Sequence, residues 1–472
     1  MIYTKNLLLP AFLLFFVFGS LTAKKPNIII ILTDDQGYTD LGCFGSDKVK
    51  TPHIDQMAKE GAKLTNFYVA APLCTPSRAG LMTGCYAQRI DMGRGQEFGV
   101  LLAEDGKGMN PSEITIAEVA KSAGYKTGMF GKWHLGDQPD FLPTKQGFDE
   151  FFGLPYSHDI HPLHPAQKKF NFPPLALLEG EEVIELDPDA DYLTKRITER
   201  AVSYIQKNKK NPFLMYVAHP MPHRPLHMSP PFMEAVPKDL RDLIAENEKV
   251  ENFVDYRTRD KIYPYAISEI DWSVGQILDE LKKQGIDKNT IVFFTSDNGA
   301  GKSANCSTSP LKGNKGTIYE GGMREPTVIR WPKKIKAGQE NKELMTAMDI
   351  LPTIAELVGY QMPDNRTIDG KNILRTLTKN EPTPYEYFFY HAQNNLLAVR
   401  HKNWKLHIHK GVKPIALYDL DKDIGESVNI LKDHPEIAEK LLKAAQEFDA
   451  ELKANIRPAG YVDTPKALTL KK

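Results

Sequence analysis

The sequence predicts an α/β fold built on a large, mostly parallel sheet, followed by a small antiparallel subdomain. Apolar, β-branched runs alternate with helix-period segments along most of the chain, which is the pattern of strands joined by crossover helices. Beyond about Arg375 the pattern changes to short alternating runs and one amphipathic segment. Because 472 residues exceed the size at which one core usually stops growing, we expect a catalytic-size α/β domain at 24–375 and a C-terminal α+β subdomain at 376–472.

The clearest expected strand, NIIIIL at 27–32, is apolar throughout and suits burial on both faces of a parallel sheet. Further strands of this sheet are expected at 126–130, 213–218, 290–296 and 327–331. Helices are expected at 54–60, 116–122, 198–207 and 265–283. The subdomain is expected to contain four short strands, in YEYFFYH, LLAVRH, WKLHIH and IALYDL, with a covering helix at 435–451.

Residues 1–23 have the pattern of a secretory signal peptide. Lys5 precedes an apolar run over 7–18, and small residues lead to an expected cleavage point after Ala23. The run is shorter than the roughly 20 apolar residues that span a bilayer, which argues against an anchor. We therefore expect an exported protein, periplasmic or secreted, with no membrane span after signal cleavage.

The charge balance excludes some partners. The 60 basic and 60 acidic side chains cancel, so no overall field favours nucleic acid or an anionic membrane. Any anion must be recognised locally. The four cysteines, Cys43, Cys74, Cys85 and Cys306, are too few to build a disulfide scaffold.

Oxygen-bearing side chains follow two of the buried strands. Asp34 and Asp35 come after the first strand, and Asp297 and Asn298 come directly after the strand at 290–296. Each pair alone is typical of a turn, but at one sheet edge the two pairs supply four hard oxygen ligands. We expect a divalent hard cation, with Ca²⁺ preferred to Mg²⁺ because an all-protein oxygen cage suits calcium better.

Nitrogen-bearing side chains follow two other strands at the same edge. Lys132 and His134 follow one strand, and His219 and His223 follow another. Zinc hydrolysis is the competing metal interpretation, but the prolines between the two later histidines keep them off a helix, so zinc's helical histidine pair is absent. This edge of the sheet is therefore the candidate active site.

Cys74 opens the segment CTPSRAGLMTG, whose Pro76 and small residues suit a helix start, where backbone N–H groups favour an anion. A helix to about Cys85 separates the two cysteines by roughly 16 Å. A disulfide needs Cα atoms within about 7 Å, so this pairing is disfavoured. A thiolate nucleophile has no use for four metal ligands, and we expect the reacting group at position 74 not to be a thiol.

The segment CTPSRAGLMTG resembles the signature of the type I sulfatases, in which this cysteine is converted enzymatically to formylglycine. Further blocks are similar to the family's and stand in its order, among them PNIIIILTDDQGYTDLGCFG, GYKTGMFGKWHLG, SDNG and LYDLDKD. GLPYSHD and GTIYEGGMREP are particularly similar to the arylsulfatase A and N-acetylgalactosamine-6-sulfatase branch. The resemblance implies an alkaline-phosphatase-like sandwich, with helices on both faces of the large sheet.

The resemblance also implies the roles of individual residues. The Ca²⁺ ligands would be Asp34, Asp35, Asp297, Asn298 and the formylglycine derived from Cys74. The catalytic residues would be Cys74, Arg78, His134 and His223. The sulfate or its leaving oxygen would be bound by Lys132, Ser157, His223 and Lys315. A formylglycine-generating maturation enzyme is implied as a partner, and His219, which does not match the motif, is expected to be scaffold.

An aldehyde hydrate offers two hydroxyl groups to this chemistry. The resemblance implies that one hydroxyl would attack sulfur and expel the alcohol, which His223 together with Lys315 would protonate. The second, deprotonated by His134, expels sulfate, so no water need attack a hindered sulfo-enzyme. Lys132, Lys315 and Arg78 stabilise the charge on the non-bridging oxygens.

Two other functions stay open at this point. Phosphonate monoester hydrolases and phosphodiesterases resemble sulfatases in fold, and a non-catalytic glycan-binding relative would arise if Cys74 stayed a thiol. A sulfated carbohydrate or an aryl sulfate is the expected substrate. The segment 224–261 is expected to be a loop at the pocket rim. A second metal is a further interpretation of His158, His161 and His164, although exposed loop histidines are the commoner case.

Overall fold

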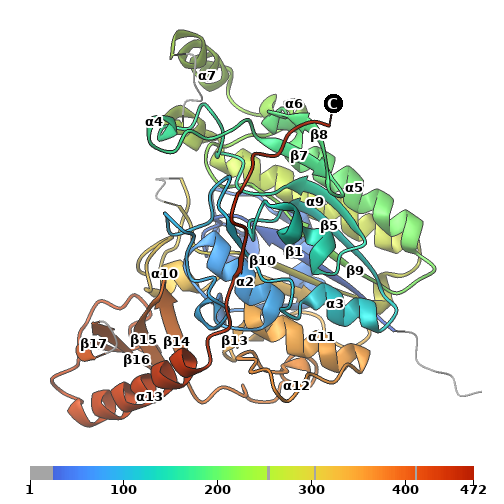
Figure 1. Ribbon diagram of the computed structural model, residues 1–472. Coiled ribbons are helices and arrows are strands. Elements are labelled where there is room, and N and C mark those ends of the chain that lie inside the picture. The colour runs from blue at the N-terminus through green and yellow to red at the C-terminus, as the bar shows by residue number, and fades with distance from the viewer. Residues whose placement is uncertain (1–24, 252–255, 302–304, 410–411, 472) are drawn as a thin grey trace, which may run out of the picture.

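The computed structural model describes residues 25–251, 256–301, 305–409 and 412–471 (Figure 1). The expected signal peptide, 1–23, lies outside the described residues. In the part of the chain that the structure describes, no helix is long and apolar enough to cross a membrane.

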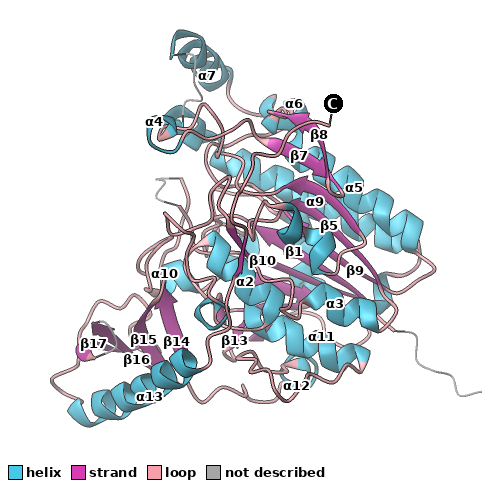
Figure 2. Cartoon of the chain, in the orientation of Figure 1, coloured by secondary structure: helices cyan, strands magenta, loops and turns pink. Residues whose placement is uncertain are grey.

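A ten-stranded sheet forms the centre of the molecule, and its middle strands are parallel as expected (Figure 2). In spatial order it consists of β12 (Gln339–Asn341), β2 (Ala62–Leu64), β11 (Thr327–Arg330), β10 (Thr290–Ser296), β1 (Asn27–Thr33), β9 (Phe213–Ala218), β5 (Lys126–Lys132), β6 (Glu150–Leu154), β7 (Ala176–Glu179) and β8 (Glu182–Leu186). Antiparallel pairs occur only toward the two edges among these strands, at β10–β11–β2 and at β6–β7–β8.

Helices cover both faces of this sheet because alternate residues of β1 point to opposite sides. Ile28 and Ile30 pack with one set of helices, α2 (Cys74–Thr83), α3 (Ile116–Ser122) and α11 (Ile350–Val358). Ile29 and Ile31 pack with the other set, α1 (Pro52–Glu60), α5 (Leu193–Asn208) and α9 (Tyr263–Lys283). All four isoleucines are 0% exposed, and truncating one to alanine would cost about 2–5 kcal/mol. The doubly covered sheet fixes the edge from which the candidate site is built.

The C-terminal antiparallel sheet and its covering helix are also confirmed. The sheet contains β14 (Phe388–Ala392), β15 (Asn395–His401), β16 (Trp404–His409) and β17 (Lys413–Asp419), and the helix is α13 (Pro435–Ala454). Phe389 of the sheet stacks on Phe448 of the helix with ring centroids 3.9 Å apart. This subdomain lies beside the large sheet, at the lower left of Figure 1.

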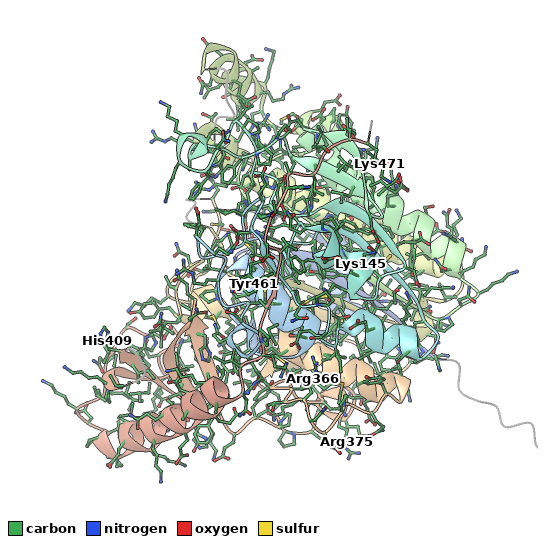
Figure 3. The ribbon with its side chains drawn as sticks, in the orientation of Figure 1. Lys145, Arg366, Arg375, His409, Tyr461 and Lys471 are labelled. Atoms are coloured by element: carbon green, nitrogen blue, oxygen red, sulfur yellow. The ribbon has the colours of Figure 1, made fainter. Side chains whose placement is uncertain are left out.

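The last residues return from the subdomain to the large sheet. β18 (Gly460–Tyr461) pairs with β4 (Lys107–Gly108), and Lys471 forms an ion pair with Glu182 of β8. Figure 3 labels Tyr461 and Lys471 along this path. The chain end therefore crosses the surface of the α/β part.

The expectation of a loop over 224–261 is wrong. This segment contains α6 (Pro230–Met233), α7 (Lys238–Glu251) and α8 (Tyr256–Arg259). The sequence DLRDLIAENEK within α7 is rich in good helix formers, and this propensity outweighs the prolines around it. Other short α-helices and strands are α4 (Gln167–Phe170), α10 (Glu320–Met323), α12 (Leu374–Lys379), β3 (Phe67–Tyr68) and β13 (Met345–Thr346).

Candidate active site

The candidate site lies at the carboxyl ends of the central strands. β1 and β10 pair in parallel up to Thr33 and Ser296, so Asp34 and Asp297 follow side by side. The N–H of Asp297 donates to the carbonyl of Thr33 across 3.0 Å, which fixes the two strand ends relative to each other. The fold therefore gathers residues that the sequence separates widely.

Three carboxylates and one amide meet at this edge. Asp34, Asp35 and Asp297 are at most 6% exposed, and Asn298 is 0% exposed. The ligand atoms of Asp34, Asp35, Cys74 and His223 all lie within 4.8 Å of one another. Asn298 Nδ2 donates to Asp35 Oδ1 across 2.7 Å, and the N–H of Asp35 lies 3.3 Å from Asp297 Oδ1. All four expected oxygen ligands thus belong to one cluster, with His223 at its rim.

The two central carboxylates have opposite electrostatic environments. Burial alone would raise the pKa of Asp34, but Lys132, His223 and Arg78 together hold that pKa well below its usual value. Burial and the negative charge of Asp34 raise the pKa of Asp297 to about 7. Additional positive charge at this point would relieve the repulsion between the two carboxylates.

Three cationic side chains surround the carboxylates. Arg78 Nε donates to Asp297 Oδ2 across 2.8 Å, and both side chains are 0% exposed. Lys132 Nζ lies 2.5 Å from Asp34 Oδ2. Lys315 Nζ lies 2.8 Å from Asp35 Oδ1 and is the most open of the three, with 20% of its side chain exposed. The site therefore balances buried acids with cations that an incoming anion can also contact.

Cys74 is the first residue of α2 and points into this cluster. Its Sγ lies 3.4 Å from Asp34 Oδ1 and 3.4 Å from Lys315 Nζ. Burial, followed by the charge of Asp34, raises the pKa of the Cys74 thiol, so the unmodified side chain is a thiol and not a thiolate nucleophile. Cys74 and Cys85 form no disulfide with each other, as expected, although α2 ends at Thr83, before Cys85.

The two expected catalytic histidines differ in exposure. His134 is 1% exposed, its Nε2 lies 2.8 Å from the carbonyl of Leu101, and its Nδ1 has no hydrogen-bond partner. This arrangement assigns the proton to Nε2, because a carbonyl can only accept. Burial and the charge of Lys132 hold the pKa of His134 well below its usual value, so the ring is neutral. His223 has 14% of its side chain exposed, and its Nε2 lies 3.7 Å from Asp35 Oδ2.

Backbone strain is present at two of these positions. Asp35 has φ of 66° and His134 has φ of 65°, a left-handed conformation that is uncommon for residues other than glycine. Such strain persists where the surrounding structure over-determines it, and it is frequent at functional sites.

The remaining expected site residues lie as follows. Ser157 Oγ accepts a hydrogen bond from Lys132 Nζ across 3.1 Å. His219 is 0% exposed and its Nε2 contacts Ser273 Oγ at 3.1 Å, away from the acidic cluster. The sequence reasoning missed Asp159, whose Oδ1 lies 3.9 Å from His223 Nδ1. Its position two residues after Ser157, in the block SHD, was the available signal.

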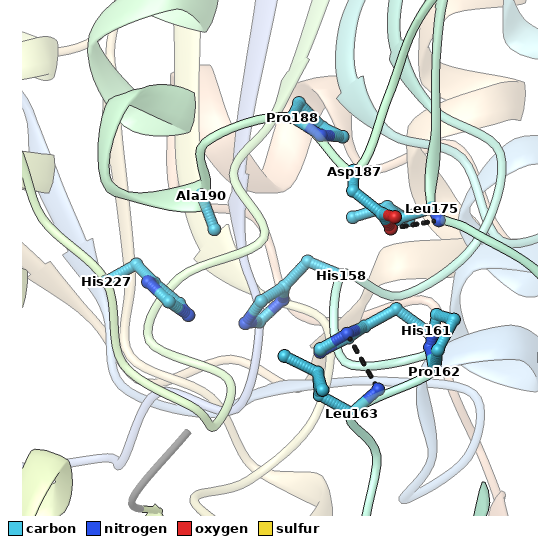
Figure 4. A pocket seen from close by; sticks show the side chains of 9 residues that line it. All are labelled: His158, His161, Pro162, Leu163, Leu175, Asp187, Pro188, Ala190 and His227. Atoms are coloured by element: carbon cyan, nitrogen blue, oxygen red, sulfur yellow. Dashed lines mark hydrogen bonds between the residues drawn. The ribbon is translucent and has the colours of Figure 1, made fainter. Parts of the chain in front are cut away.

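A pocket of about 410 Å³ has His158 in its lining (Figure 4). His158, whose ring centroid is 5.7 Å from that of His223, lines the pocket together with His161, Leu163, Asp187 and His227. His158 is only 2% exposed, so the expectation of an exposed loop histidine is wrong for this residue. Among the described residues, the cluster around Asp34 is the only group of three or more His, Cys, Asp or Glu side chains close enough to hold a metal ion, so the interpretation of His158, His161 and His164 as a second metal site has no support.

The donor set fits a hard divalent cation. Asn298 Oδ1 is buried and accepts no hydrogen bond, although its amide nitrogen is paired. An unsatisfied buried carbonyl oxygen beside three carboxylates is the kind of ligand that Ca²⁺ takes.

Comparison with known proteins gives a consistent result. The family model described as Sulfatase matches residues 26–360, and one described as N-sulphoglucosamine sulphohydrolase, C-terminal, matches residues 313–452. Arylsulfatase A of Homo sapiens is 33% identical over 93% of this chain and 90% of its own length. N-acetylgalactosamine-6-sulfatase of Rattus norvegicus is 35% identical over 86% of this chain and 76% of its own length. The crystal structure of Ps i-CgsB in complex with k-i-k-neocarrahexaose is 31% identical, covers 90% of this chain and 93% of that chain, and has a TM-score of 0.75.

Proposed function

Because the chain belongs to the type I sulfatase family and is a sulfatase, we propose that it releases sulfate from a sulfated carbohydrate. The observation that carries the proposal is the convergence of Arg78, Lys132 and Lys315 on Cys74 and the acidic cluster. Cations held at fixed positions bind the oxygens of a sulfate group and stabilise the charge that grows on them in the transition state.

Two features of the comparisons support a sugar substrate. One similar protein is named for N-acetylgalactosamine 6-sulfate chemistry, and one similar structure was solved with a neocarrahexaose. The 410 Å³ pocket is within the range of roughly 300–1,000 Å³ typical of ligand sites, and its lining residue His158 has its ring centroid 5.7 Å from that of His223. We assign this pocket to the sugar part of the ester, and we propose that the protein is exported, where polysaccharides are encountered.

We further propose that Asp34, Asp35, Asp297 and Asn298 hold Ca²⁺, and that a maturation enzyme converts Cys74 to formylglycine. When bound, the cation supplies Lewis-acid stabilisation of a sulfate oxygen, and the hydrated aldehyde supplies a hydroxyl nucleophile with a second hydroxyl beside it. The orphan oxygen of Asn298 and the high pKa of the Cys74 thiol support these assignments.

The other side chains have distinct tasks in this proposal. Lys132 and Lys315 bind sulfate oxygens, with Ser157 positioning Lys132 through their hydrogen bond. Arg78 orients the side chain at position 74, and the ion pair with Asp297 holds the Arg78 guanidinium group in place. His223 Nε2, near the surface of the site, gives a proton to the leaving oxygen.

His134 is suited to take a proton from the side chain at position 74. It is neutral, its Nε2–H is held by the carbonyl of Leu101, and its Nδ1 is free to accept. Thr75, the next residue after position 74, donates from Oγ1 to the carbonyl of His134 across 3.1 Å, which ties the two segments together.

A substrate panel tests the proposal. The protein is produced with a formylglycine-generating enzyme and incubated with sulfated mono- and disaccharides, an aryl sulfate and a phosphonate monoester, and the released anion is measured. We expect sulfate release from at least one sugar and none from a Cys74→Ala control. Turnover of the phosphonate ester alone would contradict the proposal.

A further inference from the structure

The segment that carries Lys315 is attached on both sides to the C-terminal subdomain. Three residues before Lys315, Lys312 Nζ donates to the carbonyl of Glu426 across 2.9 Å. Three residues after it, the carbonyl of Ile318 accepts a hydrogen bond from Lys405 Nζ of β16 across 2.8 Å. Both attachments are to residues that the proposed catalytic chemistry does not use.

A buried network of charges reinforces the second attachment. Lys405, Glu320 and Glu426 have side chains that are 0% exposed, and Lys405 Nζ lies 2.9 Å from Glu320 Oε1 and 3.0 Å from Glu426 Oε1. The N–H of Glu320 donates to Glu426 Oε2 across 2.7 Å, which closes the network through the backbone. Burial alone would raise the pKa of Glu320, but Lys405 and Arg400 hold that pKa at about 2, so the network is charged.

A buried network of charges contributes little net free energy to the stability of the fold. Taking several charges out of water costs free energy that their mutual attraction often does no more than offset, and apolar side chains of the same volume frequently stabilise a fold equally well. What the charges do provide is a fixed geometry, because each one is held in place by two partners.

The geometry of this segment bears directly on the site. The N–H of Lys315 donates to the carbonyl of Ala300, and the N–H of Gly316 donates to the carbonyl of Pro72, two residues before Cys74. Lys315 Nζ in turn contacts Asp35 and Cys74 Sγ. Because a displacement of about 1 Å at a reacting centre can cost about a hundredfold in rate, the placement of this backbone determines how well Lys315 meets the sulfate.

We propose that the C-terminal subdomain positions the sulfate-binding lysine, with Lys405 and Lys312 as positioning residues for Lys315. The proposal rests on the role of Lys315 given under the proposed function. The subdomain thereby contributes to anion binding although none of the residues to which we assign sulfate binding belongs to it.

The proposal is tested by measuring the affinity of the matured protein for inorganic sulfate by calorimetry. The parent is compared with Lys312→Met, Lys405→Met, Lys315→Ala and the double variant Lys312→Met/Lys315→Ala. Lys312 is exposed, and its Nζ lies 4.5 Å from the centroid of the Tyr319 ring, so methionine removes the ammonium group and its contacts without leaving a buried charge unpaired. Lys422→Met is the matched control, since Lys422 lies in the same subdomain and 84% of its side chain is exposed.

We expect Lys312→Met and Lys405→Met to weaken sulfate binding by about threefold to thirtyfold, the usual range for coupling through a contact network. In the double variant, Lys312→Met should add nothing to the loss caused by Lys315→Ala, because it acts through that lysine. A merely structural role would lower the unfolding temperature without producing this non-additivity.

Other outcomes overturn the proposal in distinguishable ways. If Lys315→Ala weakens binding while folded Lys312→Met and Lys405→Met bind as the parent does, positioning is wrong and the role of Lys315 stands. If Lys315→Ala itself binds sulfate as the parent does, the role of Lys315 fails, and the proposal fails with it. If Lys405→Met does not fold, the comparison of Lys312→Met, Lys315→Ala and their double variant decides alone. Losses of sulfate affinity that add up in the double variant then refute positioning.

Discussion

Replacing His223 by glutamine should separate binding from proton transfer. His223 Nδ1 lies 2.7 Å from the carbonyl of Arg224, so this nitrogen carries a hydrogen, and Nε2 gives a proton to the leaving group only from the doubly protonated imidazolium ring. Glutamine retains a polar side chain but has no proton to transfer at neutral pH. The proton donor is therefore lost with little change in the volume of the site.

The expected magnitude depends on the leaving group. General acid catalysis contributes typically about 10²–10⁴ in rate, equivalent to about 2.7–5.4 kcal/mol in the barrier. A sugar alcohol needs this proton because its alkoxide is a poor leaving group, whereas the oxygen of an activated phenol leaves well without it. We expect His223→Gln to lower kcat/KM by about 10²–10⁴ for a sulfated sugar, and by less than about tenfold for an activated aryl sulfate.

The assay measures kcat/KM for both esters in the parent and the variant, with sulfate release as the common readout. His434→Gln is a matched control, because His434 is a solvent-accessible histidine far along the chain that precedes α13. Equal losses on the two esters would refute the reasoning and leave His223 as a binding residue only. An unfolding midpoint equal to that of the parent shows that the loss is chemical.

Three further predictions concern the ion, the nucleophile and pH. Chelation or Asp297→Asn should abolish turnover and lower the unfolding temperature, since an ion that binds only the folded state stabilises it; an unchanged rate would contradict the metal assignment. In matured protein, the tryptic peptide ending at Arg78 should be lighter than its cysteine form in a mass spectrum, react with a hydrazide and resist thiol alkylation, whereas full activity with an alkylatable Cys74 would contradict the conversion. Burial raises the pKa of Glu269 from 4.5 to about 7, so the stability tied to its protonated form is complete below about pH 4.5 and is lost as the pH rises through about 7. Glu269→Gln should flatten this dependence in thermal unfolding followed across that range, and a parent-like slope would be the contrary result.

The sequence alone was sufficient to predict the central strands, because these strands are long, apolar and bounded by polar residues. β1, β9 and β10 lie where the pattern predicts them, and the residues that follow them meet at one edge because the strands are parallel. The antiparallel edge strands β7 and β8 were not predicted, since they are only 4 and 5 residues long and mix polar with apolar side chains. β7 forms by pairing with β6, and β8 forms by pairing with β7, and no local sequence pattern indicates these pairings.

The sequence could predict only those parts of the site that are formed by characteristic side chains. Asp34 and Asp297 stand out because each directly follows a buried strand. His134 Nε2 contacts the backbone carbonyl of Leu101. Every residue has such a carbonyl, so the identity of residue 101 could not reveal this contact. The network of Lys405, Glu320 and Glu426 joins residues 85 and 106 positions apart, so it appears only once the α/β part and the C-terminal subdomain are placed together.

Because α2 is buried in the folded protein, the proposed conversion of Cys74 must take place before folding is complete. All ten residues of this helix are buried, and a Cβ at Gly80 would lie 3.5 Å from Met348 Cγ, in a part of the chain made much later. A modifying enzyme cannot reach Cys74 in the finished fold, but it can do so while the residues that cover the helix are still being synthesised. At roughly 5–20 residues per second, that interval lasts on the order of tens of seconds. Expression conditions that accelerate folding relative to modification should therefore yield a stable protein that is permanently inactive.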